Sequence, residues 1–373
     1  MYIGKAMPRG FSESGAHSSC QSCWLWIRRC LVNSVGLLLC AGACAAPPAA
    51  ESGLAAAAPN LSLPAAASVA EAQRWFTRIQ QAPAKQSFQG TFIVTSGGAM
   101  SSARMTHYRA GKSQYELIES LNGQARQVYR HDEVIQTMWP QQRVALVEKR
   151  GKLGSFPALL EGGSSRLLEF YELRVVGVER IAGRIADVLS VTPRDDLRFA
   201  IRLWSDKDTG LLLREDVIDG GGQLLESSSF SDVVIGVTAQ PESFLAAMKK
   251  LDGYRVVRPT FMATELESEG WAQREVVPGF RRVSCIKRPL FNAGEADSTP
   301  AVEVLQTIFT DGLTYVSVFI EPYNAERHSR PVLTSIGATH TLMIRHSDWW
   351  ITVVGDVPAT TLRAFASAME RKR

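Results

Sequence analysis

From residue 88 onward, apolar and polar residues alternate along much of the chain. Phe88 and Phe92 fall on one side of an extended backbone, and Gln89 and Thr91 fall on the other, which is the pattern of a half-buried strand. The alternation returns in short runs separated by turn-forming residues, at 103–105, 115–117, 135–139, 144–146, 173–181, 185–192 and 199–203. Short strands joined by turns such as Asn122-Gly123 predict an antiparallel meander and not a series of βαβ units.

Two segments carry the spacing of amphipathic helices. Ser68 and Glu71 form a capping-box sequence, in which each side chain satisfies a backbone N–H at the start of a helix. An apolar stripe with helical spacing follows it, made of Ala72, Trp75, Phe76 and Ile79. Near the C-terminus, Pro358 suits a first helical turn because it needs no N–H there, and the stripe after it consists of Leu362, Phe365, Ala366 and Met369. Apolar residues within 151–171 predict further short helices against the sheet.

A second group of strands follows residue 271. Its alternating runs lie at 281–286, 302–309, 314–320, 339–345 and 350–354. Between 240 and 271 the strand pattern pauses, and the prolines and clustered charges there are typical of a connection between domains. The expected fold class is therefore mostly β with α+β character, in two domains, of which the second is smaller and is covered by the final helix.

The first 45 residues carry the pattern of an export signal. Arg28 and Arg29 precede an apolar run that is too short for a membrane span, and Ala43-Cys44-Ala45 supplies small residues for cleavage. A lipoprotein site at Cys44 is an alternative that lacks the usual preceding Leu. The Ala- and Pro-rich stretch after the signal is expected to be a flexible tether. The domain prediction is a signal peptide at 1–45, a tether at 46–67, an N-terminal domain at 68–240, a connection at 241–270 and a C-terminal domain at 271–373.

The cysteines and the charge narrow the class of protein further. Five of the six cysteines lie within the first 44 residues, so cleavage would leave Cys285 alone, and packing without disulfides would have to stabilise the fold. Cys285 lies in an apolar strand-like stretch and is expected to be a small buried hydrophobe. The 373 residues, 45% hydrophobic and 21% charged, are ordinary for two folded domains. A net charge of +4 is too small to indicate nucleic-acid binding.

The sequence offers no recognisable catalytic, metal or cofactor motif. It lacks a nucleophile elbow, a phosphate loop and a dinucleotide fingerprint. Asp206, Asp208 and Gly210 resemble the start of a calcium loop without its later acidic ligands, so an ordinary turn is preferred. His340 and His346 share a strand face but lie about 20 Å apart, too far for one metal ion. We therefore expect a non-enzyme with no cofactor, while a hydrolase site assembled from distant residues stays open.

Large apolar side chains gather on the strands of the first domain. Phe92, Met105, Met138, Trp139 and Trp204 all fall on segments expected to form a curved sheet. They form either an ordinary core or the lining of a partly open cavity for an acyl chain. The alternation of side chains along a strand does not show which face of a curved sheet is the concave one.

Several longer stretches carry a family pattern. They are Phe88-Gln89-Gly90-Thr91-Phe92, the segment from Leu117 to Gly123, and RFAIRLWSDKDTGLLLREDVIDGGGQLLE at 198–226. The second domain adds DGL at 311–313, VSVFIEP at 316–322 and TVVGDVP at 352–358. These stretches occur in the same order as in the RseB/MucB family of periplasmic regulators of σE and extend over nearly all of the expected mature chain. The sequence therefore resembles this family.

The resemblance implies a fold and an activity. The N-terminal domain would be like LolA and LolB, an unclosed antiparallel β-barrel with helices, followed by a smaller C-terminal domain. The protein would bind the periplasmic domain of the anti-sigma factor RseA, shield it from the site-1 protease DegS, and be released by lipopolysaccharide or another lipid. A periplasmic lipid or lipoprotein carrier is the alternative. The second domain argues against it, because such a carrier needs no second domain. Homo-oligomerisation stays open.

A basic cluster marks the first strand of the second domain. It consists of Arg281, Arg282, Lys287 and Arg288. These residues are the candidates for contact with an acidic segment of the partner protein. A solvated charged face is the alternative interpretation.

Overall fold

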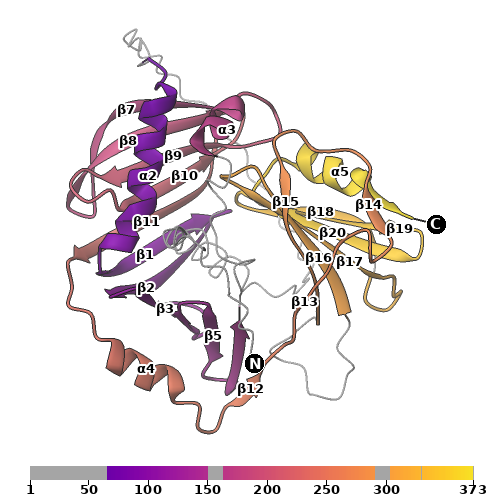
Figure 1. Cartoon of the computed structure of the whole chain (residues 1–373), viewed down its shortest axis with the longest axis horizontal. Coiled ribbons are helices and arrows are strands. Elements are labelled where there is room, and N and C mark those ends of the chain that lie inside the picture. The colour runs from indigo at the N-terminus through magenta and orange to yellow at the C-terminus, as the bar shows by residue number, and fades with distance from the viewer. Residues whose placement is uncertain (1–64, 150–162, 290–302, 329, 373) are drawn as a thin grey trace, which may run out of the picture.

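The computed structural model describes residues 65–149, 163–289, 303–328 and 330–372, arranged as two sheet-based units (Figure 1). The predicted signal peptide, the tether up to residue 64 and the stretch 150–162 lie outside the described residues. Within the described ranges, no helix is long and apolar enough to cross a membrane.

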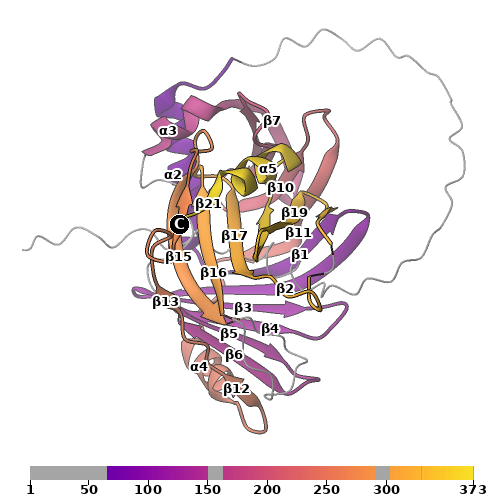
Figure 2. The ribbon, with the colours of Figure 1, turned by 90° about the vertical axis from the view of Figure 1, so that its right-hand side faces the viewer.

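The first unit is built on a twelve-stranded sheet in the order β12-β6-β5-β4-β3-β2-β1-β11-β10-β9-β8-β7. The sheet is curved and its end strands β12 and β7 are not paired with each other, so the predicted unclosed architecture is confirmed (Figure 2). The strands are β1 (Phe88–Ser96), β2 (Ala99–Ala110), β3 (Ser113–Ser120), β4 (Gln127–His131), β5 (Val134–Trp139), β6 (Val144–Lys149), β7 (Tyr171–Ile181), β8 (Arg184–Pro193), β9 (Ala200–Asp206), β10 (Leu212–Ile218), β11 (Leu224–Ile235) and β12 (Arg255–Val257).

Helix α2 (Val69–Lys85) begins where the capping box predicts. The Ser68 hydroxyl accepts a hydrogen bond from the Glu71 backbone N–H, and the Glu71 carboxylate accepts from the Ser68 N–H at 2.9 Å, which satisfies two donors that a helix start leaves open. The apolar stripe of α2 then packs against β7, β8 and β9 through Phe76 and Ile79, so this helix lies across one end of the sheet (Figure 1).

Two shorter helices cover other parts of the first sheet. Helix α3 (Gly163–Phe170) lies beside α2 and leads directly into β7. Helix α4 (Pro241–Lys249) begins with a proline and places Phe244 and Met248 against Tyr115, Tyr129 and Met138. Each helix therefore covers apolar side chains that a lone sheet would expose.

The second unit is a seven-stranded sheet in the order β13-β15-β16-β17-β20-β19-β18, with α5 packed on one face. Its core is made by Leu362 and Phe365 of α5 against strand residues such as Phe309 and Val318. Helix α5 ends at Ala368, so Met369 of the predicted helical stripe instead begins β21. The elements are β13 (Met262–Ala263), β14 (Trp271–Gln273), β15 (Arg281–Pro289), β16 (Glu303–Thr310), β17 (Tyr315–Pro322), β18 (Val332–Ile336), β19 (Thr339–His346), β20 (Trp349–Gly355), α5 (Ala359–Ala368) and β21 (Met369–Arg371).

The segment expected to be a connection with short helices, 241–270, contains helix α4 and also contributes a strand to each sheet. Arg255–Val257 forms β12 and pairs in parallel with β6, which departs from the all-antiparallel expectation. Met262–Ala263 forms β13 and pairs with β15. Two runs this short have no readable alternation, so their strand character depends on the neighbour to which they bond.

Cys285 lies within the core of the second unit and is 7% exposed. Burial raises the pKa of its thiol to about 11, so the side chain is a neutral thiol at physiological pH. The expectation of a small buried hydrophobe is confirmed for this position.

His328, in the loop before β18, links the stability of the second unit to pH. Its Nδ1 accepts a hydrogen bond from the Asn324 N–H at 2.9 Å, and its ring stacks on Trp350 at 4.8 Å. Burial lowers the pKa of His328 more than Glu321 raises it. Because the folded-state pKa lies below the unfolded value of about 6.5, this residue's stabilising effect is complete above that pH and is lost as the pH falls.

We therefore expect the free energy of unfolding to decrease between about pH 7.5 and pH 5, and a His328→Gln variant to show a smaller decrease. Urea unfolding at a series of pH values measures both slopes. Equal slopes for the two proteins would show that His328 does not supply this pH dependence.

Candidate functional site

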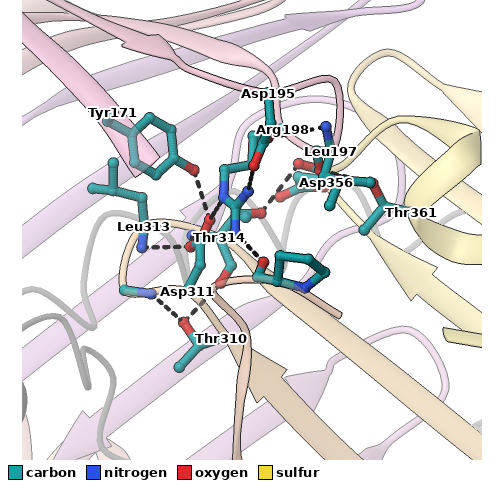
Figure 3. A network of polar contacts seen from close by, with 12 residues as sticks. Tyr171, Asp195, Leu197, Arg198, Thr310, Asp311, Leu313, Thr314, Asp356 and Thr361 are labelled. Atoms are coloured by element: carbon teal, nitrogen blue, oxygen red, sulfur yellow. Dashed lines mark hydrogen bonds and ion pairs between the residues drawn. The ribbon is translucent and has the colours of Figure 1, made fainter. Parts of the chain in front are cut away.

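A buried arginine joins the two units. Arg198 lies in the loop between β8 and β9, and its side chain has no exposed surface. Its Nε donates to Asp311 Oδ2 at 2.7 Å, and Asp311, at the turn between β16 and β17, is equally buried. Arg198 also forms an ion pair with Asp195 and donates to the carbonyl oxygen of Pro278 at 2.5 Å. Figure 3 shows Asp195 of the first unit and Asp311 of the second converging on the guanidinium.

Aromatic rings surround the same guanidinium. It lies 4.7 Å from the ring centre of Phe170 and 4.9 Å from that of Phe280, distances at which a desolvated cation gains from the ring faces. Tyr171 donates its hydroxyl to Asp311 Oδ2 at 2.7 Å. Burial, followed by the charge of Asp311, raises the pKa of Tyr171 well above its ordinary value, so the phenol keeps its proton. Burial also opposes the charge of Arg198, but the neighbouring carboxylates, Asp311 before Asp195, outweigh it and leave the pKa of Arg198 raised.

Local backbone structure fixes both ends of this ion pair. Asp311 Oδ1 accepts from the backbone N–H groups of Leu313 and Thr314, each at 2.9 Å, which orients the carboxylate within its turn. On the other side, Gly279 has φ +81° and lies so close to the guanidinium that a Cβ would overlap Arg198 Nη2. Glycine meets both demands because it has no side chain and tolerates positive φ.

Further contacts hold the second unit against the first. Thr361 of α5 donates to the carbonyl oxygen of Leu197 at 2.7 Å. Ala338, in the turn between β18 and β19, is fully buried against Phe199 and Val217. At the same turn, Gly337 approaches the hydroxyl of Ser96 too closely to accept a Cβ. The junction therefore combines a buried charge network with apolar packing at a second place.

The five residues predicted to line an acyl cavity do not form one lining. Phe92, Met105 and Trp204 are at most 2% exposed and belong to one core cluster. Along the register of β2 to β5, Met105 shares a face with Ile118, Val128 and Thr137, so Met138 lies on the opposite face, under α4. Trp139 shares the face of Met105 and is half-buried.

A groove of about 470 Å³ lies elsewhere, between α2 and Thr209 of the turn after β9. It has three basic side chains along it, and none of the five predicted cavity residues borders it. Its lining consists of Ala70, Gln73, Arg74, Thr77, Arg78, Gln81, Ala82, Lys85 and Thr209.

The basic cluster on β15 is already paired within the chain. Arg282 bonds Glu265 at 2.8 Å and Glu267 at 3.3 Å, and Lys287 bonds Glu269 at 2.6 Å. The hydrogen bond from Lys287 lowers the pKa of Glu269, and that of Lys287 is raised in turn. The other two members of the cluster also have partners. Arg281 interacts within the chain. Arg288 lies 4.0 Å from Glu148 and over the ring of Phe261.

Comparison with known proteins places this chain in a family. The model of the MucB/RseB N-terminal domain matches residues 71–248, and that of the MucB/RseB C-terminal domain matches residues 265–370. The chain belongs to the MucB/RseB family. The resemblance seen in the sequence is thereby confirmed, and the two matched ranges correspond to the two sheet-based units.

Relatives and solved structures agree with this assignment. The sigma factor AlgU regulatory protein MucB of Pseudomonas aeruginosa is 30% identical over 81% of this chain and 91% of the relative. The sigma-E factor regulatory protein RseB of Salmonella typhimurium is 25% identical over 76% and 85%. Structures of the P. aeruginosa MucA/MucB complex and of MucB in complex with MucA(peri) have TM-scores of 0.61 and 0.59, at 28% identity over 81% of this chain and 99% of theirs.

Sequence reasoning missed the junction of this MucB/RseB family member. In the sequence, Arg198 and Asp311 stand out only as the first residues of two family stretches, 198–226 and 311–313. Neither stretch shows the ion pair, because it joins positions 113 residues apart. Within the described residues, no group of three or more His, Cys, Asp or Glu side chains is placed to hold a metal ion.

We predict that Asp311→Asn lowers the free energy of unfolding by roughly 3 kcal/mol or more, because it removes the charge that compensates buried Arg198. Asparagine keeps an oxygen for the N–H groups of Leu313 and Thr314, so the turn itself is preserved. Urea unfolding measures the change. Asp208→Asn, at a carboxylate that is 87% exposed, is the control and should change stability by less than about 0.5 kcal/mol. A loss below about 1 kcal/mol in Asp311→Asn would contradict the role of the pair.

Proposed function

We propose that this protein is a periplasmic negative regulator of a σE-type envelope-stress response that binds the periplasmic domain of a membrane-spanning anti-sigma factor. The observation that carries the proposal is the similarity to MucB in complex with MucA(peri), which extends over 81% of this chain and 99% of that chain. The two family matches cover most of both sheet-based units. Export by the predicted signal peptide would place the protein in the compartment where such a domain is exposed.

We further propose that the partner contacts the basic cluster on β15. Arg282 and Lys287 are about one-third exposed and are held by glutamates of the preceding segment. Exposed ion pairs contribute about 0 to 1 kcal/mol each, so an acidic segment of the partner would replace Glu265, Glu267 and Glu269 at little cost. Covering the partner in this way would shield it from site-1 proteolysis.

Binding of the purified anti-sigma periplasmic domain, measured by calorimetry, tests both proposals. We expect the double variant Arg282→Glu, Lys287→Glu to weaken binding at least tenfold, or about 1.4 kcal/mol, and to reduce the dependence of affinity on salt. Arg363→Glu, at an exposed position on α5, is the matched control and should bind like wild type.

The possible outcomes test the proposed function and the proposed binding surface separately. No binding by the wild-type protein would refute the function itself. Wild-type binding that the double variant retains in full would refute only the placement on β15.

Release by lipid is the remaining part of the proposal. Phe92, Met105 and Trp204 are packed against protein, so an acyl chain must repack them as it enters, and half-buried Trp139 marks the accessible part of that face. Met138, under α4, would respond only if that helix moved.

We expect lipopolysaccharide to lower the affinity for the anti-sigma domain, a tenfold loss corresponding to about 1.4 kcal/mol of coupling. Trp139→Ala should change the lipopolysaccharide concentration needed for this loss, whereas Gln141→Ala, at an exposed turn position, should not. Identical affinities with and without lipopolysaccharide would argue against lipid release.

A further inference from the structure

Basic side chains run along the groove beside α2. Arg74, Arg78 and Lys85 border it, and the helix from the first to the last of them is about 16 Å long at 1.5 Å per residue. Arg78 is held by the chain, because it donates to the carbonyl oxygen of Asp206 at 3.2 Å. Arg74 and Lys85 are exposed, and neither forms an ion pair with any residue that the structure describes. Lys85 donates only to Gln81, at 2.8 Å, so both cations are available to a ligand.

Apolar side chains lie beside Arg78 on the hairpin of β7 and β8. Arg78 forms an ion pair with Asp187 of β8 at 3.7 Å, which places Asp187 on the sheet face that α2 covers. Val178 is the partner of Asp187 in the register, and Ile185 precedes Asp187 by two residues, so both side chains lie on that same face. Val178 is 54% exposed and Ile185 is 51% exposed. The hairpin therefore adds two solvent-exposed apolar side chains to the side of the molecule that carries the basic groove.

Two further cations border this apolar pair. Arg180 lies opposite Ile185 in the register, and the backbone N–H of Lys207 donates to the Ile185 carbonyl oxygen at 2.9 Å. Both basic residues are exposed and have no ion pair among the described residues. We call the whole set the α2 surface; it consists of Arg74, Lys85, Val178, Arg180, Ile185 and Lys207.

The carboxylates near the α2 surface are engaged elsewhere. Glu71 is part of the helix cap. Asp187 pairs with Arg78 at 3.7 Å. Asp208 lies 3.9 Å from Arg184. Among the described residues, no carboxylate is therefore in contact with the cations of the α2 surface, and the surface is positive.

The layout of the α2 surface fits a bilayer better than a soluble anion. One phosphate is too small to reach cations spread along about 16 Å of helix, and a soluble anion would gain nothing from exposed Val178 and Ile185. A bilayer with anionic phospholipids offers many phosphates in one layer, and its acyl boundary lies directly beneath them. Such a surface can therefore meet the cations and the apolar side chains at the same time.

We propose that the α2 surface docks this protein on a membrane that carries anionic phospholipids, with Val178 and Ile185 at the boundary between headgroups and acyl chains. None of the residues predicted to line an acyl cavity belongs to this surface, so docking is separate from release by lipid. One consequence rests on the proposed function. Because the anti-sigma factor spans a membrane, docking on that membrane raises the effective concentration of the two proteins for each other.

Sedimentation with vesicles tests the docking in exported protein and needs no anti-sigma domain. The protein should bind vesicles of phosphatidylcholine and phosphatidylglycerol but not vesicles of phosphatidylcholine alone, and added salt should weaken the binding. The double variant Arg74→Glu, Lys85→Glu should bind at least tenfold more weakly. The matched control, Lys250→Glu, Arg363→Glu, changes the net charge equally at exposed positions outside the α2 surface and should bind like wild type. Circular dichroism and thermal unfolding establish that both variants are folded.

A polarity-sensitive dye tests the contact of the apolar side chains. In exported protein carrying Cys285→Ser, the dye on Ile185→Cys should shift its emission to shorter wavelength when vesicles with phosphatidylglycerol are added. The dye on Val276→Cys, at a position between β14 and β15 that is 72% exposed, is the control and should keep its emission.

No binding to either kind of vesicle, equal binding to both, full binding by Arg74→Glu, Lys85→Glu, or an unchanged dye at position 185 would overturn the proposal. Release of the bound protein by inorganic phosphate, beyond the effect of sodium chloride at the same ionic strength, would overturn it in favour of a soluble phosphate ligand. Because no anti-sigma domain is present, each of these results leaves the proposed function standing.

Discussion

The fold depends on a charged pair that has no access to water. Removing Arg198 and Asp311 from solvent costs several kcal/mol for each ion, and the cost is recovered only when both charges are paired and their remaining hydrogen-bonding groups are satisfied. Here the satisfying groups come from separate segments of both units, with Asp195 and Tyr171 from the first and the Pro278 carbonyl from the segment leading into β15. This geometry exists only when the two sheets stand in one relative position.

The charged residues of β15 remain in contact with water, so they do not pay this cost of desolvation and their ion pairs are weak. Arg282 and Lys287 meet their glutamates in water, where pairing is weak and other anions can substitute. The buried junction therefore fixes the relative position of the two units, while the ion pairs of the basic cluster can exchange with other anions. Arg288, which approaches Glu148 of β6 at 4.0 Å, connects this surface with the first sheet.

The local sequence predicted most of the fold. The capping box located the start of α2, and the two-residue period located most strands, because both signals lie within a few neighbouring residues. Strands β4, β12, β13, β14, β18 and β21 were not predicted. β12 is too short for a period, and β18 has none because both of its faces are exposed. Met138 was grouped with Trp139 although adjacent strand residues face opposite ways, and Arg198 gave no local sign of its partner 113 positions away.

The distance between the two units tests this account most directly. Spin labels at position 141, in the turn between β5 and β6, and at position 363, on α5, would both be exposed and would report the separation of the two sheets by pulsed electron resonance in exported protein carrying Cys285→Ser. If the buried pair holds the units together, the protein without partner gives one narrow distance distribution. A broad distribution, or two separate distances, would contradict the claim that Arg198 and Asp311 fix the relative position of the two units.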